Sequence, residues 1–299
     1  MKIIVLGAAA GGGFPQWNAA STNNRLAFAG DPRAPCATQC SLAVSVDGRD
    51  WLLLNAAPDI RQQIMATPEL HPREIPRSSP IKSVVLTGAD VDAIAGLLSL
   101  RERQQFSVWT SSYVIGAIET NPIFEVLDRH LVRFESIGAG GRFVPIHGLS
   151  CETFAAPGKP PLYLERTEGV APLEGASLGL RLTDEQGKAL VFLPACAEVT
   201  PAIVRAVDGA DALFFDGTMY TDDEMVRSGE GGKTARRMGH VAMTGNGGAI
   251  EALRKTNVGQ RYFIHINNTN PVLNRTSAER KAVEAAGWRI AEDGMRIEL

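Results

Sequence analysis

The chain has 299 residues, of which 44% are hydrophobic and 21% are charged, and its formal net charge is −3 at pH 7. This composition is typical of a globular protein with a sizeable core. The negative charge argues against nucleic-acid binding, which needs a basic surface. No apolar run approaches the roughly 20 residues that span a bilayer, so we expect no direct membrane insertion.

The chain begins with a short apolar run that ends at a glycine-rich loop. The run Ile3–Leu6 is too short and too weakly charged at its start for a signal peptide, and it predicts a first β-strand. A cytoplasmic location follows as an expectation. The loop Gly7–Gly13 matches neither a dinucleotide fingerprint nor a P-loop, so a tight turn is favoured over nucleotide binding.

Strand and helix signals alternate along the rest of the chain, which favours a layered α/β fold. The predicted strands are Ile3–Leu6, Cys40–Val46, Trp51–Asn55, Ser83–Leu86, Ser107–Thr110, Arg142–Val144, Cys151–Phe154, Ser177–Thr183, Ala189–Leu193, Ala212–Asp216 and Tyr262–His265. The predicted helices are Asp59–Ala66, Asp92–Glu102, Ser111–Glu119, Thr200–Ala206, Gly247–Arg254 and Ser277–Ala286. Asp47-Gly48 predicts a hairpin between the second and third strands. Two halves of this content are consistent with an αββα sandwich, which we expect to be one domain over residues 1–299.

Four cysteines are too few for a disulfide framework in a chain of this length. Cys36 and Cys40 have no second pair to complete a zinc knot and are interpreted as ordinary thiols. Cys196 follows the strand Ala189–Leu193, where structural burial is the simplest interpretation.

Two carboxylates, Asp90 and Asp92, follow the buried strand Ser83–Leu86. Strand ends in α/β proteins present side chains where ligands bind. Both carboxylates are candidate metal ligands. Asp92 could instead cap the helix that follows, since Asp is a favoured N-cap residue.

Two of the five histidines stand in places that suit chemistry. His265 ends a buried strand and enters a polar turn, so one ring nitrogen could be oriented while the other faces a site. The alternative is a structural histidine that fixes that turn. His240 follows Arg236-Arg237 and a glycine, in a loop that we expect to open a helix. It could face a substrate or lie on the surface.

Asp216 ends the apolar strand Ala212–Asp216 and enters a glycine turn. A carboxylate brought in by such a strand needs partners, so Asp216 should either bond the amides of its turn or face the site.

Several stretches together resemble the family of pyrroloquinoline quinone biosynthesis proteins B, in the metallo-β-lactamase superfamily. They are Leu6–Asn18, Leu53–Gln63, Gly96–Glu102, Phe215–Thr218, Arg237–His240 and His265–Leu273. The likeness spans essentially the whole chain and implies a metallo-β-lactamase-type αββα sandwich.

The resemblance implies a role in making the redox cofactor pyrroloquinoline quinone (PQQ). One reaction assigned to the family is iron-dependent hydroxylation of the tyrosine ring in an intermediate derived from a Glu and a Tyr of a precursor peptide. The alternative is a non-catalytic carrier that binds PQQ or its precursor and assists transport to the periplasm. A metal-dependent hydrolase ranks third, because a two-metal hydrolytic centre needs more imidazoles than this chain supplies. The sequence leaves the oligomeric state open, a homodimer included.

The chain departs from the family where metals bind. The resemblance places zinc-binding cysteines at the positions of Ala19, Ser21 and Asn24, so we expect that structural zinc to be absent. The superfamily's central turn carries histidines where this chain has Gly88, Asp90 and Ala93.

Two further superfamily ligand positions are altered, to Lys159 and to the pair Ala195-Cys196. Asp92, His265 and Asp90 remain as the predicted metal ligands. Iron is the expected metal if any binds, and with Ala93 in the turn, His240 has to supply a second imidazole. As an enzyme, the chain would use His240 and Asp216 to position substrate or transfer protons.

Overall fold

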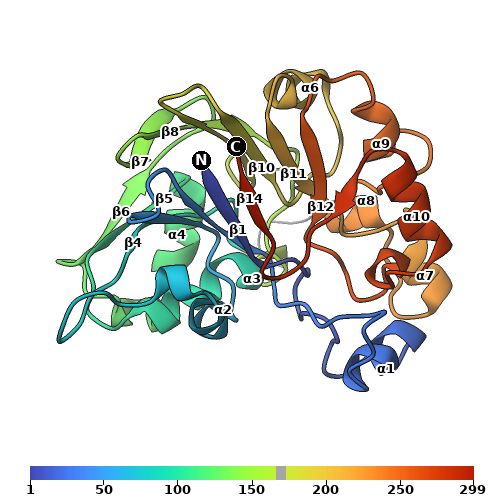
Figure 1. The fold of residues 1–299 in the computed structure, drawn as a ribbon, viewed down its shortest axis with the longest axis horizontal. Helices are drawn as coiled ribbons and strands as arrows, with labels where there is room; N and C mark the ends of the chain where they lie inside the picture. The colour runs from blue at the N-terminus through green and yellow to red at the C-terminus, as the bar shows by residue number, and fades with distance from the viewer. Residues whose placement is uncertain (166–172) are drawn as a thin grey trace.

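The computed structural model describes residues 1–165 and 173–299 and places two seven-stranded sheets face to face (Figure 1). The first sheet contains β1 (Lys2–Gly7), β2 (Ser41–Ser45), β3 (Trp51–Leu54), β4 (Ile81–Val85), β5 (Phe106–Thr110), β6 (Val132–Ser136) and β14 (Arg296–Glu298), in the order β14-β1-β2-β3-β4-β5-β6. The second contains β7 (Arg142–Ile146), β8 (Leu149–Ala155), β9 (Leu178–Asp184), β10 (Ala189–Leu193), β11 (Ala212–Asp216), β12 (Gln260–Ile264) and β13 (Arg289–Ile290), in the order β13-β12-β11-β10-β9-β8-β7.

Helices lie on the outer faces of both sheets, which gives the expected αββα layers (Figure 1). The α-helices are α1 (Thr22–Phe28), α2 (Ile60–Ala66), α3 (Val91–Ile94), α4 (Ser112–Glu119), α6 (Pro201–Val207), α7 (Glu224–Ser228), α8 (Ala235–Met238), α9 (Ala249–Ala252) and α10 (Ala278–Ala285). Short 3₁₀ helices are η1 (Pro68–Leu70), η2 (Ala95–Leu100), η3 (Pro122–Val126) and η4 (Pro271–Leu273).

The alternation of side chains along each strand divides the core into three layers. In β11, Phe214 packs between the sheets, while Leu213 and Phe215 pack under the helices of the second sheet. In β1, Val5 faces the other sheet and Ile4 faces the helices of the first sheet. Apolar residues are therefore buried on both faces of these strands, which explains their near-continuous hydrophobic runs.

Each sheet has a parallel half, and those halves bring the candidate residues together. β3, β4, β5 and β6 run parallel in the first sheet, and β10, β11, β12 and β13 run parallel in the second. The carboxyl ends of parallel strands share one edge. The segments after β4, β10 and β12 carry Asp90 and Asp92, Cys196, and His265, and β11 itself ends at Asp216.

The sequence predicted every strand on which the site depends, with shifts of one or two residues at the ends. The predicted hairpin is the antiparallel pair β2–β3. The sequence reasoning missed the edge strands β6, β13 and β14 and the short helices α1, α7 and α8.

The prediction of one continuous α-helix over Asp92–Glu102 is wrong. The chain makes only a short α3 and then the 3₁₀ helix η2. The segment after β3 competes for its hydrogen bonds: Ala93 O accepts from Ala56 N (2.8 Å), and Gly96 N donates to Ala56 O (2.8 Å). A Cβ at Gly96 would lie 2.2 Å from Ala57 O, so only glycine permits this close approach.

Across the described parts of the chain, 1–165 and 173–299, no helix has the length and apolar character needed to cross a membrane.

Candidate functional site

A cavity of about 330 Å³ lies where the carboxyl ends of the parallel strands meet. One wall carries the polar side chains of Asp90, Asp92, His240 and His265. Another part is apolar and includes Leu162 together with three methionines, Met219, Met225 and Met238. The cavity thus joins a cluster of metal-binding side chains to a surface that suits a flat apolar group.

Asp216 lies under this cavity and is completely buried. Its Oδ2 accepts from Cys196 N (2.8 Å) and contacts His240 Nδ1 (2.8 Å). Its Oδ1 accepts from Thr218 N (3.0 Å) and Thr218 Oγ1 (2.7 Å). Four donors therefore satisfy one carboxylate, which offsets the cost of burying its charge. Gly217 permits the turn, since a Cβ there would lie 2.6 Å from Ile266 Cδ1.

His240 is held by Asp216 in a defined orientation. It follows Gly239, whose left-handed backbone (φ 91°) ends α8 and turns the chain toward the cavity. The Asp216 carboxylate can only accept, so Nδ1 of His240 carries the proton in their 2.8 Å contact. Nε2 of the neutral ring is then an unprotonated nitrogen, the form that binds a metal.

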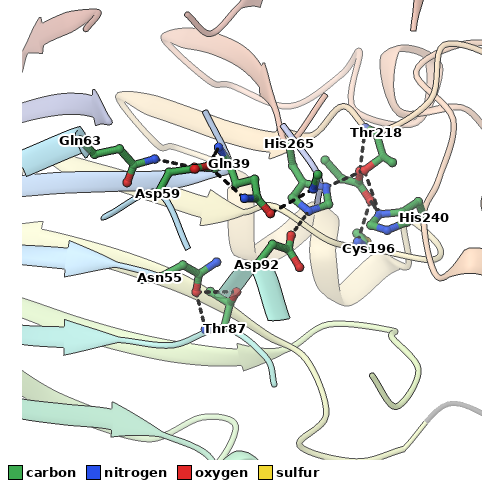
Figure 2. A network of polar contacts seen from close by, with 12 residues as sticks. Gln39, Asn55, Asp59, Gln63, Thr87, Asp92, Cys196, Thr218, His240 and His265 are labelled. Carbon is green, nitrogen blue, oxygen red and sulfur yellow. Dashed lines mark hydrogen bonds and ion pairs between the residues drawn. The ribbon is translucent and has the colours of Figure 1, made fainter. Parts of the chain in front are cut away.

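His265 is oriented in the same way by Thr218 (Figure 2). The Thr218 hydroxyl donates its one proton to Asp216, so it accepts from His265 Nδ1 at 2.8 Å. His265 has a left-handed backbone (φ 62°), an uncommon conformation for a residue other than glycine. The ring of His265 lies 5.3 Å from the ring of His240, centroid to centroid.

The other ring nitrogen of His265, Nε2, lies 2.8 Å from Asp92 Oδ2. With Nδ1 protonated, both atoms of this contact are lone-pair acceptors in the neutral histidine. Two acceptors at this separation need a cation between them, either a proton or a metal ion. Asp92 Oδ2 and His265 Nε2 are therefore adjacent candidate ligand atoms that face one point in the cavity.

The charges of the cavity affect one another. Burial is the largest influence on Asp92 and opposes its ionisation, but the hydrogen bond from His265 and the charges of the His265 and His240 rings together outweigh it and lower the pKa of that carboxyl. Burial likewise opposes protonation of His265, and the Asp92 hydrogen bond and charge raise its pKa. Asp90 is open to the cavity, where the surrounding protein and the Asp92 charge raise its pKa to about 6.

Comparison with known proteins fixes the family. The beta-lactamase superfamily domain matches residues 50–266. Coenzyme PQQ synthesis protein B of Methylobacterium sp. (strain 4-46) is 49% identical, and that of a Methylorubrum extorquens strain is 48% identical, each over the full length of both chains. The chain belongs to the coenzyme PQQ synthesis protein B family. The crystal structure of Zn²⁺-bound PqqB from Methylobacterium extorquens, 47% identical, superposes with a TM-score of 0.97 and covers all of both chains.

Within this family fold, the altered superfamily positions take other roles. Ala93 is buried among apolar residues of the first sheet's outer layer. Cys196 is completely buried, its Sγ donates to Glu198 O (3.1 Å), and burial raises the pKa of its thiol to about 12. A protonated, buried thiol is a poor metal ligand.

Lys159, which the family resemblance matches to a superfamily histidine, lines the cavity. Its Nζ pairs with Glu165 Oε1, and Lys233 Nζ lies 3.2 Å from Glu165 Oε2. Hydrogen bonding by Lys159 lowers the pKa of the Glu165 carboxyl. Two ammonium groups thus share one carboxylate at the edge of the cavity.

Two sequence-based interpretations need correction. The alternative that Asp92 caps a helix is wrong, because α3 begins at Val91 with Asp90 in the N-cap position, and Asp92 bonds His265 instead. The expectation that His240 opens a helix is also wrong, because α8 ends at Met238 before it. The sequence reasoning missed Thr218, although its place directly after Asp216-Gly217 was a signal for a partner of that carboxylate.

Proposed function

We propose that this protein catalyses an iron-dependent step of PQQ biosynthesis, the hydroxylation of the tyrosine ring in a Glu–Tyr-derived intermediate. The observation that carries the proposal is the 2.8 Å contact between His265 Nε2 and Asp92 Oδ2 inside the cavity. Two lone-pair atoms placed to share one cation, either a proton or a metal ion, beside a wall that suits an aromatic ring are consistent with a metal-dependent ring oxidation.

The ligand atoms of Asp216, His240 and His265 lie within 4.8 Å of one another, and Asp92 adjoins this group through His265. Asp92, His265 and His240 make up the two-histidine, one-carboxylate combination that is typical of non-haem Fe(II) sites and leaves coordination positions open. Thr218 and Asp216 orient the two imidazoles from behind, as outer partners of metal-binding histidines do. Asp90 adds a further carboxylate to the same cavity. The same groups also suit Zn²⁺.

Iron, when bound, would supply the activation of dioxygen. The overall step inserts one oxygen atom into a ring C–H bond and releases the other as water, and a reductant provides two electrons. Met219, Met225 and Met238 offer thioether contacts to the ring, worth about 0.3–1.5 kcal/mol each. Asp90, with its pKa raised to about 6, is suited to hold and release a proton at a carboxylate oxygen near neutral pH.

The ammonium group of Lys159 is suited to bind a carboxylate of the intermediate. Lys159 and Lys233 share the single carboxylate of Glu165, so these three groups together carry one positive charge. A substrate carboxylate at the cavity edge could take over part of the Lys159 pairing. This would orient the ring toward Asp92 and His265.

The alternative is a metal-free protein that binds PQQ or its precursor and assists its transport to the periplasm. Burial of the methyl group of Ala93 in an apolar layer, where the superfamily turn provides an imidazole, favours this alternative. Tight binding of PQQ by metal-free protein, with no oxygen consumption after addition of Fe(II), would decide for it.

The enzyme proposal is tested by loading the protein with Fe(II) without oxygen and then adding the tyrosine-containing intermediate, a reductant and ¹⁸O₂. We expect one labelled oxygen atom in the product ring and matching oxygen uptake. His265→Ala should abolish both, while His130→Ala, a change at an exposed histidine, should leave both unchanged. Equal product from wild type and His265→Ala would refute the proposal.

A further inference from the structure

The segment between β1 and β2 is tied to the loop after His265 by a closed set of amide hydrogen bonds. Asn24 in α1 is completely buried. Its Oδ1 accepts from Gln16 N (2.8 Å), and its Nδ2 donates to Ser21 Oγ (2.7 Å) and to Asn268 Oδ1 (3.0 Å). Asn268 Nδ2 in turn donates to Gln16 Oε1. We call Gln16, Ser21, Asn24 and Asn268 the amide clasp.

Residues of the amide clasp provide all the hydrogen-bond partners that the buried side-chain amide of Asn24 needs. Both protons of Nδ2 are donated and Oδ1 has a donor. A buried amide that lost these partners would be strongly unfavourable, so the four groups hold one arrangement. The clasp joins three parts of the chain that are up to 252 residues apart in sequence.

A metal ion does not fit this place. Zinc in structural sites is bound by four thiolate or imidazole donors, sometimes carboxylates. Ala19 offers no donor, Ser21 accepts a hydrogen bond from Asn24, and Asn24 presents its NH₂ group to its neighbours. Within residues 1–165 and 173–299, the one group of three His, Cys, Asp or Glu side chains whose ligand atoms all lie within 4.8 Å of one another is Asp216, His240 and His265, which lies at the cavity and not at the clasp.

We propose that in this chain the amide clasp takes the place of the structural zinc that the family resemblance implies at positions 19, 21 and 24. The N-terminal segment is then held without a metal, and metal bound by the protein belongs to the cavity around His265.

The clasp also positions one side of the cavity. Asn268 lies three residues after His265, and the same loop is fixed to the glycine turn because Asn270 Nδ2 donates to Gly217 O (3.0 Å). The segment before Gln16 is bonded to the same loop, because Ala10 N donates a hydrogen bond to Ile266 O (2.8 Å). Ala10 and Gly11 line the cavity. Gln16, Ser21, Asn24 and Asn268 are therefore positioning residues for the cavity wall.

The first test uses wild-type protein and trypsin, because Arg25 in α1 is an exposed cleavage site. Protein dialysed against a chelator should be cut at Arg25 at the same rate as untreated protein. Asn24→Leu should be cut at least 10-fold faster, and Thr22→Ala, an exposed change in the same helix, should be cut at the wild-type rate. Faster cleavage of wild type after chelation would overturn the proposal.

The second test converts the clasp into a zinc site. The triple variant Ala19→Cys, Ser21→Cys, Asn24→Cys should resist trypsin only when zinc is supplied. If it does not fold, Asn268→Ala is the second variant, and it should raise the cleavage rate at Arg25 and weaken zinc binding at the cavity.

Metal content separates this proposal from the proposed function. Wild-type protein incubated with zinc and desalted should hold no more than one ion per chain, and His265→Ala should hold none. About one zinc retained by His265→Ala would overturn the clasp proposal. Failure of iron-dependent hydroxylation, with an unchanged trypsin result, would leave the clasp intact and refute only the enzyme.

Discussion

Replacing Thr218 by valine should weaken metal binding at the cavity without unfolding the protein. Valine keeps the shape of threonine but removes the hydroxyl that accepts from His265 Nδ1 and donates to Asp216 Oδ1. His265 Nδ1 then has no acceptor there, and the ring can place its proton on Nε2, the nitrogen that faces Asp92. Loss of such an outer partner costs about 10–100-fold in metal affinity, or about 1.4–2.8 kcal/mol.

The assay is a competitive titration of Fe(II) or Zn²⁺ against a coloured chelator, with urea unfolding of the same samples. Thr218→Ser, which keeps the hydroxyl, is the matched control and should bind metal within a few-fold of wild type. We expect Thr218→Val to remain folded, with a loss of about 1–3 kcal/mol for the two broken hydrogen bonds. Wild-type metal affinity in Thr218→Val would show that the hydroxyl does not set the tautomer of His265.

Three other charged groups near the cavity give separate tests. Glu224 is buried, and its pKa is raised to about 7, mainly by burial. The folded state therefore binds this proton more tightly than the unfolded state. As the pH rises from about 4.5 to above 7, the free energy of unfolding of the wild type should fall by about 3 kcal/mol relative to Glu224→Gln, measured by urea unfolding. Asp216→Asn replaces an acceptor of the His240 Nδ1 proton, so iron affinity should fall at least 10-fold while Asp211→Asn, a change at a partly exposed carboxylate, should have no such effect. Lys159→Met should raise the KM for a carboxylate-bearing intermediate about 10-fold with little change in kcat, and Lys159→Arg should restore it; an unchanged KM would remove Lys159 from substrate binding.

Much of the fold was predictable because burial leaves a clear pattern in the sequence. The strands β10 and β11 and the carboxyl-terminal half of β12 carry apolar runs that are buried on both faces, so these runs stand out from the surrounding loops. Their carboxyl ends carry Cys196, Asp216 and His265, and parallel pairing alone brings these residues to one edge. The edge strand β14, three residues with a charged residue at each end, has no such pattern.

The details of the site depend on contacts that a sequence does not record. Whether Asp92 caps a helix or bonds His265 is decided by the packing of one sheet against the other, 173 residues away in the chain. The role of Thr218 depends on one hydroxyl lying within reach of two imidazoles and a carboxylate. The shortening of α3 follows from the close approach at Gly96, which no periodicity predicts.

The metal content of protein loaded with Fe(II) without oxygen and then desalted tests the central claim most directly. We predict about one iron per chain in the wild type, and a loss of at least ten-fold in occupancy in both His265→Ala and Asp92→Asn. The same iron content in wild type and in the two variants would contradict the assignment of these residues to a common metal site.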